Sequence, residues 1–281
     1  MVRELLRWGK AQLGATEVSP IDAELLLAHA LGVSRMELHS KVFDLSPEEI
    51  ERVTEEFHHN INERLSGEPT QYIVGEAPFR YLTLDVGPGV LIPRPETEVL
   101  VDEVLHQLAR YEEPVSIIDL GSGSGAIAIS IVSEVSGKKD VRVVAVEKSA
   151  DALKWLHQNI AKFDLPIRVV AEDVADALPG IKADVVVSNP PYIPNAEVLP
   201  KEVADFEPTV ALRGGDGNGM EVPKEFIRAS LRLLKSGGLL AMEHHESQAE
   251  LIATELISEC EEIKIHYDLA QRPRFTTAIK K

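Results

Sequence analysis

The segment that decides the fold is Val115-Ser-Ile-Ile-Asp119-Leu-Gly121-Ser-Gly123-Ser-Gly125-Ala126. A short apolar run leads into three closely spaced glycines and then into a helical stretch, which is the order of a strand, a loop and a helix. Glycines let a ligand approach the backbone closely, and the following helix presents free N–H groups. The loop also fits a loose G-x-G-x-x-A dinucleotide fingerprint, so it predicts a nucleotide-like ligand without separating a dehydrogenase from other nucleotide-binding proteins.

Helices and strands alternate after this loop. The apolar runs at residues 141–146, 167–171 and 183–188 are predicted strands, and residues 150–163 form a predicted helix. This alternation is typical of a parallel sheet, in which the carboxyl ends of neighbouring strands meet at one edge. The sequence therefore predicts an α/β domain with a ligand crevice at that edge.

The predicted strands each lead to a polar residue. Asp119 ends the first strand, and Glu147, Asp173 and Asn189 come after the next three. Because parallel strands end together, these four residues are predicted to converge on the crevice. The Glu147 carboxylate is expected to accept both hydroxyls of a ribose there, although a glutamate at a strand end can also be a simply solvated residue.

The tetrad Asn189-Pro190-Pro191-Tyr192 predicts the kind of substrate atom that reacts. Proline fixes φ and has no N–H, so carbonyls near the two prolines have no helical partner and can point at a ligand. Asn189 offers a side-chain acceptor beside them, and Tyr192 offers an aromatic face. A planar NH2 group, such as a carboxamide or the amine of adenine, requires these features. The alternative is an ordinary Asn-Pro turn at the end of a strand.

Residues 115–192 resemble the class I S-adenosylmethionine-dependent methyltransferases, which combine a D-x-G-x-G-x-G loop with an acidic residue for the ribose. The N-P-P-Y tetrad is carried by two families that methylate amino groups. One family modifies adenine in nucleic acid, and the other modifies glutamine in peptide chain release factors. The tetrad alone leaves both families open.

The flanking sequence is similar to the long signature of the release-factor glutamine methyltransferases. The matching stretches are Gly67-Glu-Pro-Thr-Gln-Tyr-Ile-Val-Gly75, Val90-Leu-Ile-Pro-Arg-Pro-Glu-Thr-Glu98, Phe206-Glu-Pro208 and Gly214-Gly-Asp-Gly217. The resemblance covers nearly the whole chain. It implies S-adenosylmethionine as the cofactor and class 1 release factors as protein substrates, methylated on the glutamine of a Gly-Gly-Gln loop.

The resemblance also implies the fold and the roles of the site residues. We expect a class I, Rossmann-like sheet of seven mostly parallel strands. The residues expected to bind the cofactor are Asp119, Gly121, Ser122, Gly123, Ser124, Gly125, Glu147, Asp173, Val174 and Asn189. The residues expected to bind the substrate and to serve in catalysis are Asn189, Pro190, Pro191 and Tyr192, with Arg94 as a further substrate contact. For Arg94, an internal salt bridge is an equally open interpretation.

In the expected reaction, the amide nitrogen of glutamine attacks the methyl group of the cofactor. This nitrogen is a poor nucleophile because its lone pair is delocalised into the carbonyl. Asn189 Oδ1 and the Pro190 carbonyl are expected to accept the two amide hydrogens, while Pro191 and Tyr192 hold the plane of the amide.

Two positions depart from the family pattern, because His245 and Gln271 stand where the family has glycines. These departures concern the local turn geometry more than the chemistry. The neighbouring histidines 244 and 245, like 58 and 59, invite a metal-binding interpretation, but no cysteine or acidic cluster completes a ligand set, so no metal is expected.

The composition is consistent with a soluble cytoplasmic protein that does not bind nucleic acid. The chain has 29 Lys and Arg against 46 Asp and Glu, a formal net charge of −17, and the acidic excess extends over both the N-terminal part and the rest. Such a surface repels phosphates, so direct binding to nucleic acid is not expected. A single cysteine, Cys260, fits a reducing compartment, and neither a signal peptide nor a membrane span is predicted.

The N-terminal part is predicted to be a small helical bundle, residues 1–67, that recognises the substrate or only stabilises the catalytic domain. Helices are expected at residues 2–13 and 21–31, then after the capping box of Ser34 and after Ser46-Pro47. Ile50, Val53, Phe57, Ile61 and Leu65 form one apolar stripe on the last of these helices. Residues 68–95 are predicted to be a β-hairpin linker, and residues 96–281 the methyltransferase domain, with a long loop at 194–220.

Overall fold

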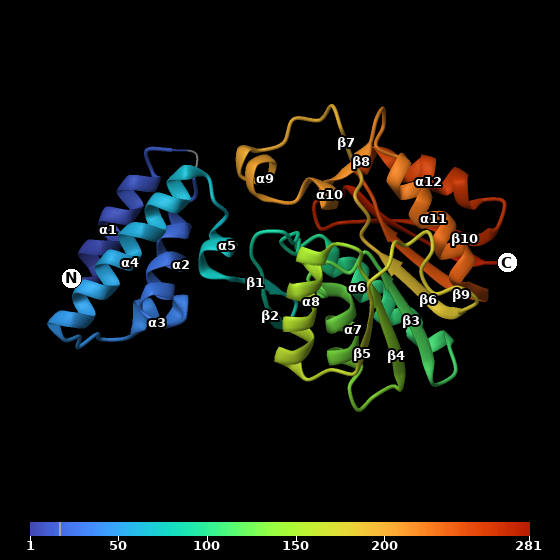
Figure 1. The fold of residues 1–281 in the computed structure, drawn as a ribbon, viewed down its shortest axis with the longest axis horizontal. Helices are drawn as coiled ribbons and strands as arrows, with labels where there is room; N and C mark the ends of the chain where they lie inside the picture. The colour runs from blue at the N-terminus through green and yellow to red at the C-terminus, as the bar shows by residue number, and fades with distance from the viewer. Residues whose placement is uncertain (17) are drawn as a thin grey trace. The chain divides into compact units, whose positions relative to one another are not determined.

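The computed structural model describes residues 1–16 and 18–281. The chain divides into two compact units (Figure 1). The first unit contains Met1–Glu76 and Leu199–Phe206, and the second contains Ala77–Val198 and Glu207–Lys281. A short piece from the second half of the chain thus packs with the N-terminal helices.

The first unit is helical. Its helices are α1 (Val2–Leu13), α2 (Pro20–Ala30), α3 (Arg35–Ser40), α4 (Pro47–Ser66), α5 (Thr70–Val74) and α9 (Lys201–Phe206). The first two predicted helices agree with α1 and α2 to within one residue at each end, and α3 and α4 begin where the sequence predicts their start. Local side chains fix where two of them begin, because Ser34 and Ser46 each form a capping box with a glutamate three residues later.

The predicted apolar stripe of α4 faces the core of the helical unit in its central part. Val53, Phe57 and Ile61 are buried among residues of α1 and α2, whereas Ile50 is half-buried and Leu65 is exposed. The stripe therefore identifies the buried face of the helix, but its last residue reaches the surface.

The second unit contains the predicted seven-stranded sheet, in the order β10-β11-β9-β6-β3-β4-β5. Strand β11 runs antiparallel to its neighbours, and the other pairs are parallel. The strands are β3 (Val115–Leu120), β4 (Val141–Val146), β5 (Ile167–Val170), β6 (Ala183–Ser188), β9 (Leu234–Glu243), β10 (Cys260–Tyr267) and β11 (Pro273–Lys280).

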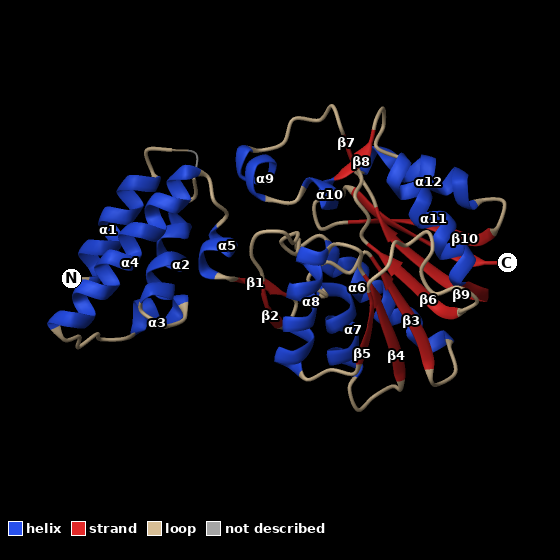
Figure 2. Cartoon of the chain, in the orientation of Figure 1, coloured by secondary structure: helices blue, strands red, loops and turns tan. Residues whose placement is uncertain are grey.

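Helices cover both faces of this sheet (Figure 2). On one face, α6 (Thr97–Gln107), α7 (Ala126–Val135) and α8 (Ala150–Phe163) bury residues such as Leu100, Ile129 and Leu156. On the other face, α11 (Glu221–Leu233) and α12 (Ala249–Leu256) bury residues such as Ile227 and Ile252. The strands between two such layers are buried on both sides, which explains their almost continuous apolar sequence.

The order of the strands determines where a ligand can bind. From β3, the chain adds β4 and β5 on one side and then places β6 on the other side. Such a switch point opens a crevice at the carboxyl ends of the strands. Asp119, Glu147 and Asn189 lie at or just after the ends of β3, β4 and β6, as the sequence predicts.

The connecting segments differ from the prediction in two places. The hairpin of strands β1 (Glu76–Phe79) and β2 (Leu82–Asp85) is present, but it occupies only part of residues 68–95, because α5 precedes it. The predicted loop at 194–220 contains α9, α10 (Thr209–Leu212) and the strand β8 (Arg213–Gly215), which pairs with β7 (Ile193–Pro194). These elements are too short to show a hydrophobic period.

Two 3₁₀ helices complete the second unit, η1 (Leu108–Arg110) and η2 (Glu246–Gln248). Among residues 1–16 and 18–281, no helix combines the length and the apolar character needed to cross a membrane.

Candidate active site

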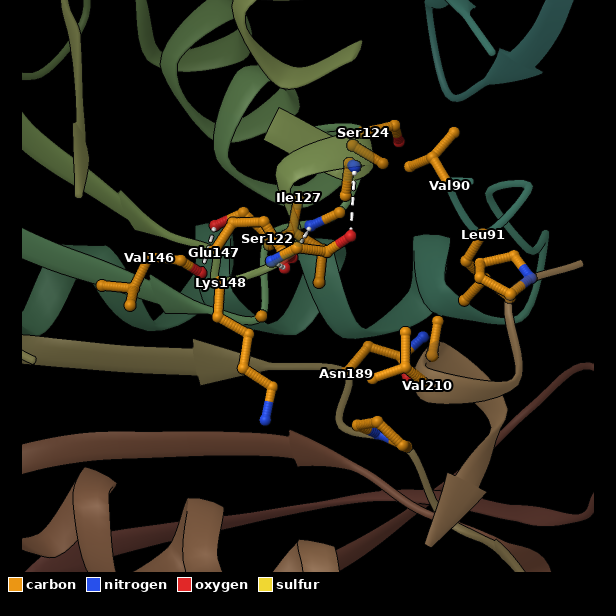
Figure 3. Close-up of a pocket in the computed structure, with 18 of the residues that line it drawn as sticks. Val90, Leu91, Ser122, Ser124, Ile127, Val146, Glu147, Lys148, Asn189 and Val210 are labelled. Carbon is orange, nitrogen blue, oxygen red and sulfur yellow. Dashed lines mark hydrogen bonds between the residues drawn. The ribbon is translucent and has the colours of Figure 1, made fainter. Parts of the chain in front are cut away.

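A cavity of about 510 Å³ lies at the predicted crevice (Figure 3). Glu147, Asn189 and Leu91 reach it from three different segments of the chain. The volume falls in the range that is usual for cofactor and small-molecule sites. The predicted site residues that line it are Arg94, Gly121, Ser122, Gly123, Ser124, Glu147, Asp173, Val174, Asn189 and Pro191.

The glycine loop has the backbone that its sequence requires. Gly121, Gly123 and Gly125 all have positive φ, at 71°, 55° and 86°. A Cβ atom on Gly125 would lie 2.7 Å from Leu156 Cδ1 and 2.8 Å from Ile129 Cδ1, whereas at Gly123 the nearest atom would be 3.9 Å away. Gly125 thus allows helix α7 to pack, and Gly123 leaves open space that a ligand can fill.

Glu147 is held by the loop that it faces. Its Oε2 accepts the Gly123 N–H at 2.9 Å, and its Oε1 accepts the Ser149 N–H at 2.7 Å. Each carboxylate oxygen has a second lone pair, so both remain able to accept a ligand hydroxyl. The orientation of the side chain is therefore set by the protein itself.

Asp119 lies beneath the loop and is not among the described residues that line the cavity. Its Oδ2 accepts the Ala128 N–H of α7 at 3.2 Å, and its Oδ1 is buried without a hydrogen-bond partner. Burial raises the pKa of this carboxyl to about 7. The geometry favours a role in fixing the start of α7 over a direct ligand contact.

Asp173 borders the same cavity together with Lys148, and the two side chains form an ion pair at 3.0 Å. The Ala175 N–H and Lys148 hold the pKa of Asp173 below its usual value. Asp173 therefore offers an ionised carboxylate near Glu147.

Two of the four tetrad residues line the cavity. Asn189 and Pro191 line the cavity, whereas Pro190 and Tyr192 are not among the described lining residues. The Tyr192 hydroxyl donates to Glu243 Oε1 at 3.0 Å, and burial beside this carboxylate raises the pKa of Tyr192 well above its usual value. The tyrosine ring is thus anchored by its hydroxyl end.

Arg94 lines the cavity, but its guanidinium is engaged within the protein. Its Nη2 lies 2.6 Å from Glu207 Oε1, and the other oxygen of Glu207 accepts the Ile92 N–H at 3.1 Å. Glu207 belongs to the Phe-Glu-Pro stretch of the signature, so the pair connects two signature segments beside the cavity. The internal salt bridge that the sequence left open is present.

Three residues near the tetrad were not predicted as site residues. Thr97 Oγ1 donates to Glu243 Oε2 at 2.7 Å and accepts the Asn189 Nδ2–H at 3.2 Å. Gln248 Nε2 donates to the Tyr192 carbonyl at 2.9 Å. Thr97 stands in a signature segment, but nothing in the sequence pairs it with Glu243 or pairs Gln248 with Tyr192.

The histidine pairs take structural positions. Burial lowers the pKa of His244 to about 4, and its Nε2 lies 2.9 Å from Thr276 Oγ1. The His58 ring packs against Trp8 at a tilt, with 4.1 Å between the ring centroids and 46° between the ring planes. Outside residue 17, no three His, Cys, Asp or Glu side chains are grouped as a metal site.

The two departures from the family pattern have different geometry. His245 has a φ of −64°, which any residue adopts, and its side chain caps the 3₁₀ helix η2. Gln271 has a φ of 61°, in the left-handed region that favours glycine. Only Gln271 therefore occupies a position where a glycine would relieve strain.

The chain is similar to known proteins over nearly its whole length. Residues 4–75 match the family described as the PrmC N-terminal domain, and residues 95–206 match the methyltransferase small domain. The chain is 39% identical to the release factor glutamine methyltransferase of Mycolicibacterium smegmatis, over 99% of this chain and 98% of that protein. It is also 39% identical to the protein of the same name from Streptomyces coelicolor, over 92% and 90% of the two chains.

The fold is shared with a solved methyltransferase. A 16S rRNA methyltransferase of T. thermophilus, in complex with AdoMet and guanosine, aligns with a TM-score of 0.53 and 18% identity. The alignment covers 73% of this chain and 50% of that one. At this identity, the likeness concerns the fold alone.

Proposed function

Since this chain belongs to the release factor glutamine methyltransferase family, we propose that it methylates the side-chain amide nitrogen of the glutamine in the Gly-Gly-Gln loop of peptide chain release factors, using S-adenosylmethionine. The observation that carries this proposal is the position of the Asn189 side chain. Its amide lines the cavity that the glycine loop and Glu147 also border, and its Nδ2 is already bonded to Thr97. The side-chain oxygen of Asn189 is therefore available to a substrate amide.

The residues around the cavity fit S-adenosylmethionine. Gly123 leaves open space above the loop, and the Glu147 carboxylate retains lone pairs for the ribose hydroxyls. The rest of the cavity wall near the loop is formed by Gly121, Ser122, Ser124, Asp173 and Val174. Asp119 and Gly125 are not among the described residues that line the cavity and instead contact helix α7, which follows the loop. When bound, the cofactor would supply an electrophilic methyl group on a sulfonium ion: as the N–C bond forms, the S–C bond breaks to leave a neutral thioether, and the amide nitrogen loses one proton to solvent.

The tetrad orients the substrate amide. Asn189 Oδ1 and the Pro190 carbonyl accept the two N–H groups of the glutamine, and Pro191 and Tyr192 confine the amide plane. Two acceptors on the nitrogen direct its lone pair toward the methyl donor and favour the partial loss of amide planarity that attack requires. Positioning of this kind is worth roughly 7 to 11 kcal/mol in well-oriented reactions.

The partner is a protein, and we propose that it is a class 1 release factor. The net charge of −17 disfavours direct binding to nucleic acid or to anionic membranes. We assign residues 1–67 to substrate recognition, residues 68–95 to the connection and residues 96–281 to catalysis. Release factors work on ribosomes, so the proposed compartment is the cytoplasm.

A transfer assay with tritiated S-adenosylmethionine tests the proposal. A purified class 1 release factor and a nucleic acid rich in adenine are incubated with the full-length protein in parallel. We expect label in the release factor and none in the nucleic acid, and we expect no label when the Gly-Gly-Gln glutamine is replaced by asparagine. Label in adenine alone would overturn the proposal in favour of an adenine methyltransferase.

A further inference from the structure

A chain of hydrogen bonds connects both ends of the tetrad to one buried carboxylate. Glu243 Oε2 accepts from Thr97 Oγ1 at 2.7 Å, and Thr97 Oγ1 accepts from Asn189 Nδ2 at 3.2 Å. The other oxygen, Oε1, accepts from the Tyr192 hydroxyl at 3.0 Å. Glu243 thus contacts Tyr192 directly and Asn189 through Thr97.

The carboxylate is placed behind the cavity. Glu243 is 1% exposed and is not among the described residues that line the cavity, while Thr97 is 3% exposed and lies at the first turn of α6. A buried carboxylate is costly unless its oxygens are hydrogen-bonded. Both of its oxygens have a donor, and these two donors lead to the tetrad.

The donors and acceptors in this series of hydrogen bonds can be assigned in only one way. An ionised carboxylate only accepts hydrogen bonds, and a threonine hydroxyl has only one hydrogen. Because Thr97 donates that hydrogen to Glu243, its oxygen can only accept from Asn189. The Asn189 group that faces Thr97 must therefore be the Nδ2 amine, since two oxygens in this contact would repel each other.

We propose that Glu243 and Thr97 are positioning residues that fix the side-chain amide of Asn189 with its oxygen toward the substrate nitrogen. This inference rests on the proposed function, because a glutamine amide requires an acceptor at this point and a flipped Asn189 would present a second donor. Donation by Nδ2 also polarises the amide of Asn189, which strengthens Oδ1 as an acceptor. The same carboxylate holds the Tyr192 ring, so one buried group sets both ends of the tetrad.

Removal of the Thr97 hydroxyl at constant shape tests the proposal. In Thr97→Val, Asn189 loses the acceptor that fixes its orientation, while the packing of the side chain is retained. We expect the single-turnover rate of release factor methylation to fall about 10- to 100-fold at saturating cofactor. Thr97→Ser keeps the hydroxyl and is expected to restore the rate to within about threefold of the unsubstituted protein.

Two controls separate positioning from folding and from cofactor binding. Thr254→Val removes an exposed hydroxyl on α12 that donates to the Glu250 carbonyl, and it should not change the rate. The dissociation constant for S-adenosylmethionine, measured by calorimetry, should stay within about threefold in Thr97→Val. A lower rate with unchanged cofactor affinity is the expected result.

The proposal is overturned if Thr97→Val methylates at the full rate, or if Thr97→Ser is as slow as Thr97→Val. A double substitution adds a second criterion. The double variant Thr97→Val and Glu243→Gln should have a rate no lower than that of the slower single variant, since both substitutions act through Asn189. If the rate losses of the two single variants multiply in the double variant, the two residues do not act through the same series of hydrogen bonds. Failure of the proposed function is recognised separately, because the unsubstituted protein would then not methylate the release factor.

Discussion

The Glu147 carboxylate accepts the Gly123 N–H at 2.9 Å, so the acid after β4 and the glycine loop after β3 form one rigid wall of the cavity. Replacement of Glu147 by alanine removes the carboxylate that we propose as the acceptor for the ribose hydroxyls, and it removes the acceptor of the Gly123 N–H. We expect the dissociation constant for S-adenosylmethionine to rise about 10- to 100-fold, the range for lost hydrogen bonds to a charged group. Calorimetry measures the affinity, and turnover at saturating cofactor should change much less. An unchanged affinity would contradict the ribose assignment.

Asn189 should act on turnover and not on cofactor binding. In Asn189→Ala, the substrate amide loses an acceptor that is oriented in advance, and a single lost donor or acceptor of this kind typically costs roughly 100-fold or more in rate. The affinity for S-adenosylmethionine should stay within about tenfold. Rapid-quench measurement of methyl transfer gives the rate. Equal rates for the variant and the unsubstituted protein would remove Asn189 from the mechanism.

The rate should depend on pH through Glu243. Burial raises the pKa of this carboxyl to about 7, while Thr97, Tyr192 and Arg274 oppose the rise and Glu96 adds to it. The ionised form, which keeps Thr97 as a donor to it, predominates above this value. The single-turnover rate should therefore be full above about pH 8 and fall as the pH drops through 7.

Glu243→Gln supplies the control for this pH dependence. Its side chain does not titrate, so the variant should show a lower rate without the acidic decline. Measurement at saturating cofactor excludes changes in binding that arise from Asp119, whose pKa is also raised to about 7. If the rate of Glu243→Gln still falls as the pH drops through 7, a group other than Glu243 causes the pH dependence.

Substitutions of Arg94 and of Glu207 should lower the stability of the protein by different amounts. The Glu207 side chain is 1% exposed and that of Arg94 is 31% exposed. Arg94→Met leaves a buried carboxylate unpaired and should lower the free energy of unfolding by about 3 kcal/mol. Glu207→Gln leaves a guanidinium that water can reach and should cost about 1 kcal/mol. Denaturant titration measures both values, and unchanged stability in Arg94→Met, with weaker substrate binding, would favour a substrate contact instead.

Glycine should have opposite effects at the two positions where the family carries it. Gln271 has a φ of 61°, so Gln271→Gly relieves a left-handed conformation and should raise the free energy of unfolding by about 0.5–1 kcal/mol. His245 has a φ of −64°, and its side chain accepts the Ser247 N–H, so His245→Gly should lower the free energy of unfolding by about 1 kcal/mol. Thermal unfolding of the two variants compares them directly, and a shared sign would contradict this account.

The parts of the fold that were predictable have local causes. The boundaries of β4 and α8 follow from an apolar run and from the cap at Ser149, both of which lie within a few residues of the element. The convergence of Glu147 and Asn189 was also predictable, because parallel strands end at one edge of the sheet.

The relations that sequence reasoning missed join distant positions. Thr97 and Glu243 are 146 residues apart, and their hydrogen bond requires the end of β9 to lie beside the first turn of α6. The register of β9 against β6, which pairs Met242 with Ser188, places Glu243 behind the tetrad. Neither hydrophobic periodicity nor a short motif predicts how β9 is aligned with β6.

The measurement that tests the central claim most directly is tandem mass spectrometry of a release factor after incubation with the protein and S-adenosylmethionine. We predict a gain of one methyl group, located by fragmentation on the side-chain amide of the Gly-Gly-Gln glutamine and absent when Asn189→Ala replaces the unsubstituted protein. A methyl group on any other residue, or one that Asn189→Ala adds equally fast, would contradict this account of the site.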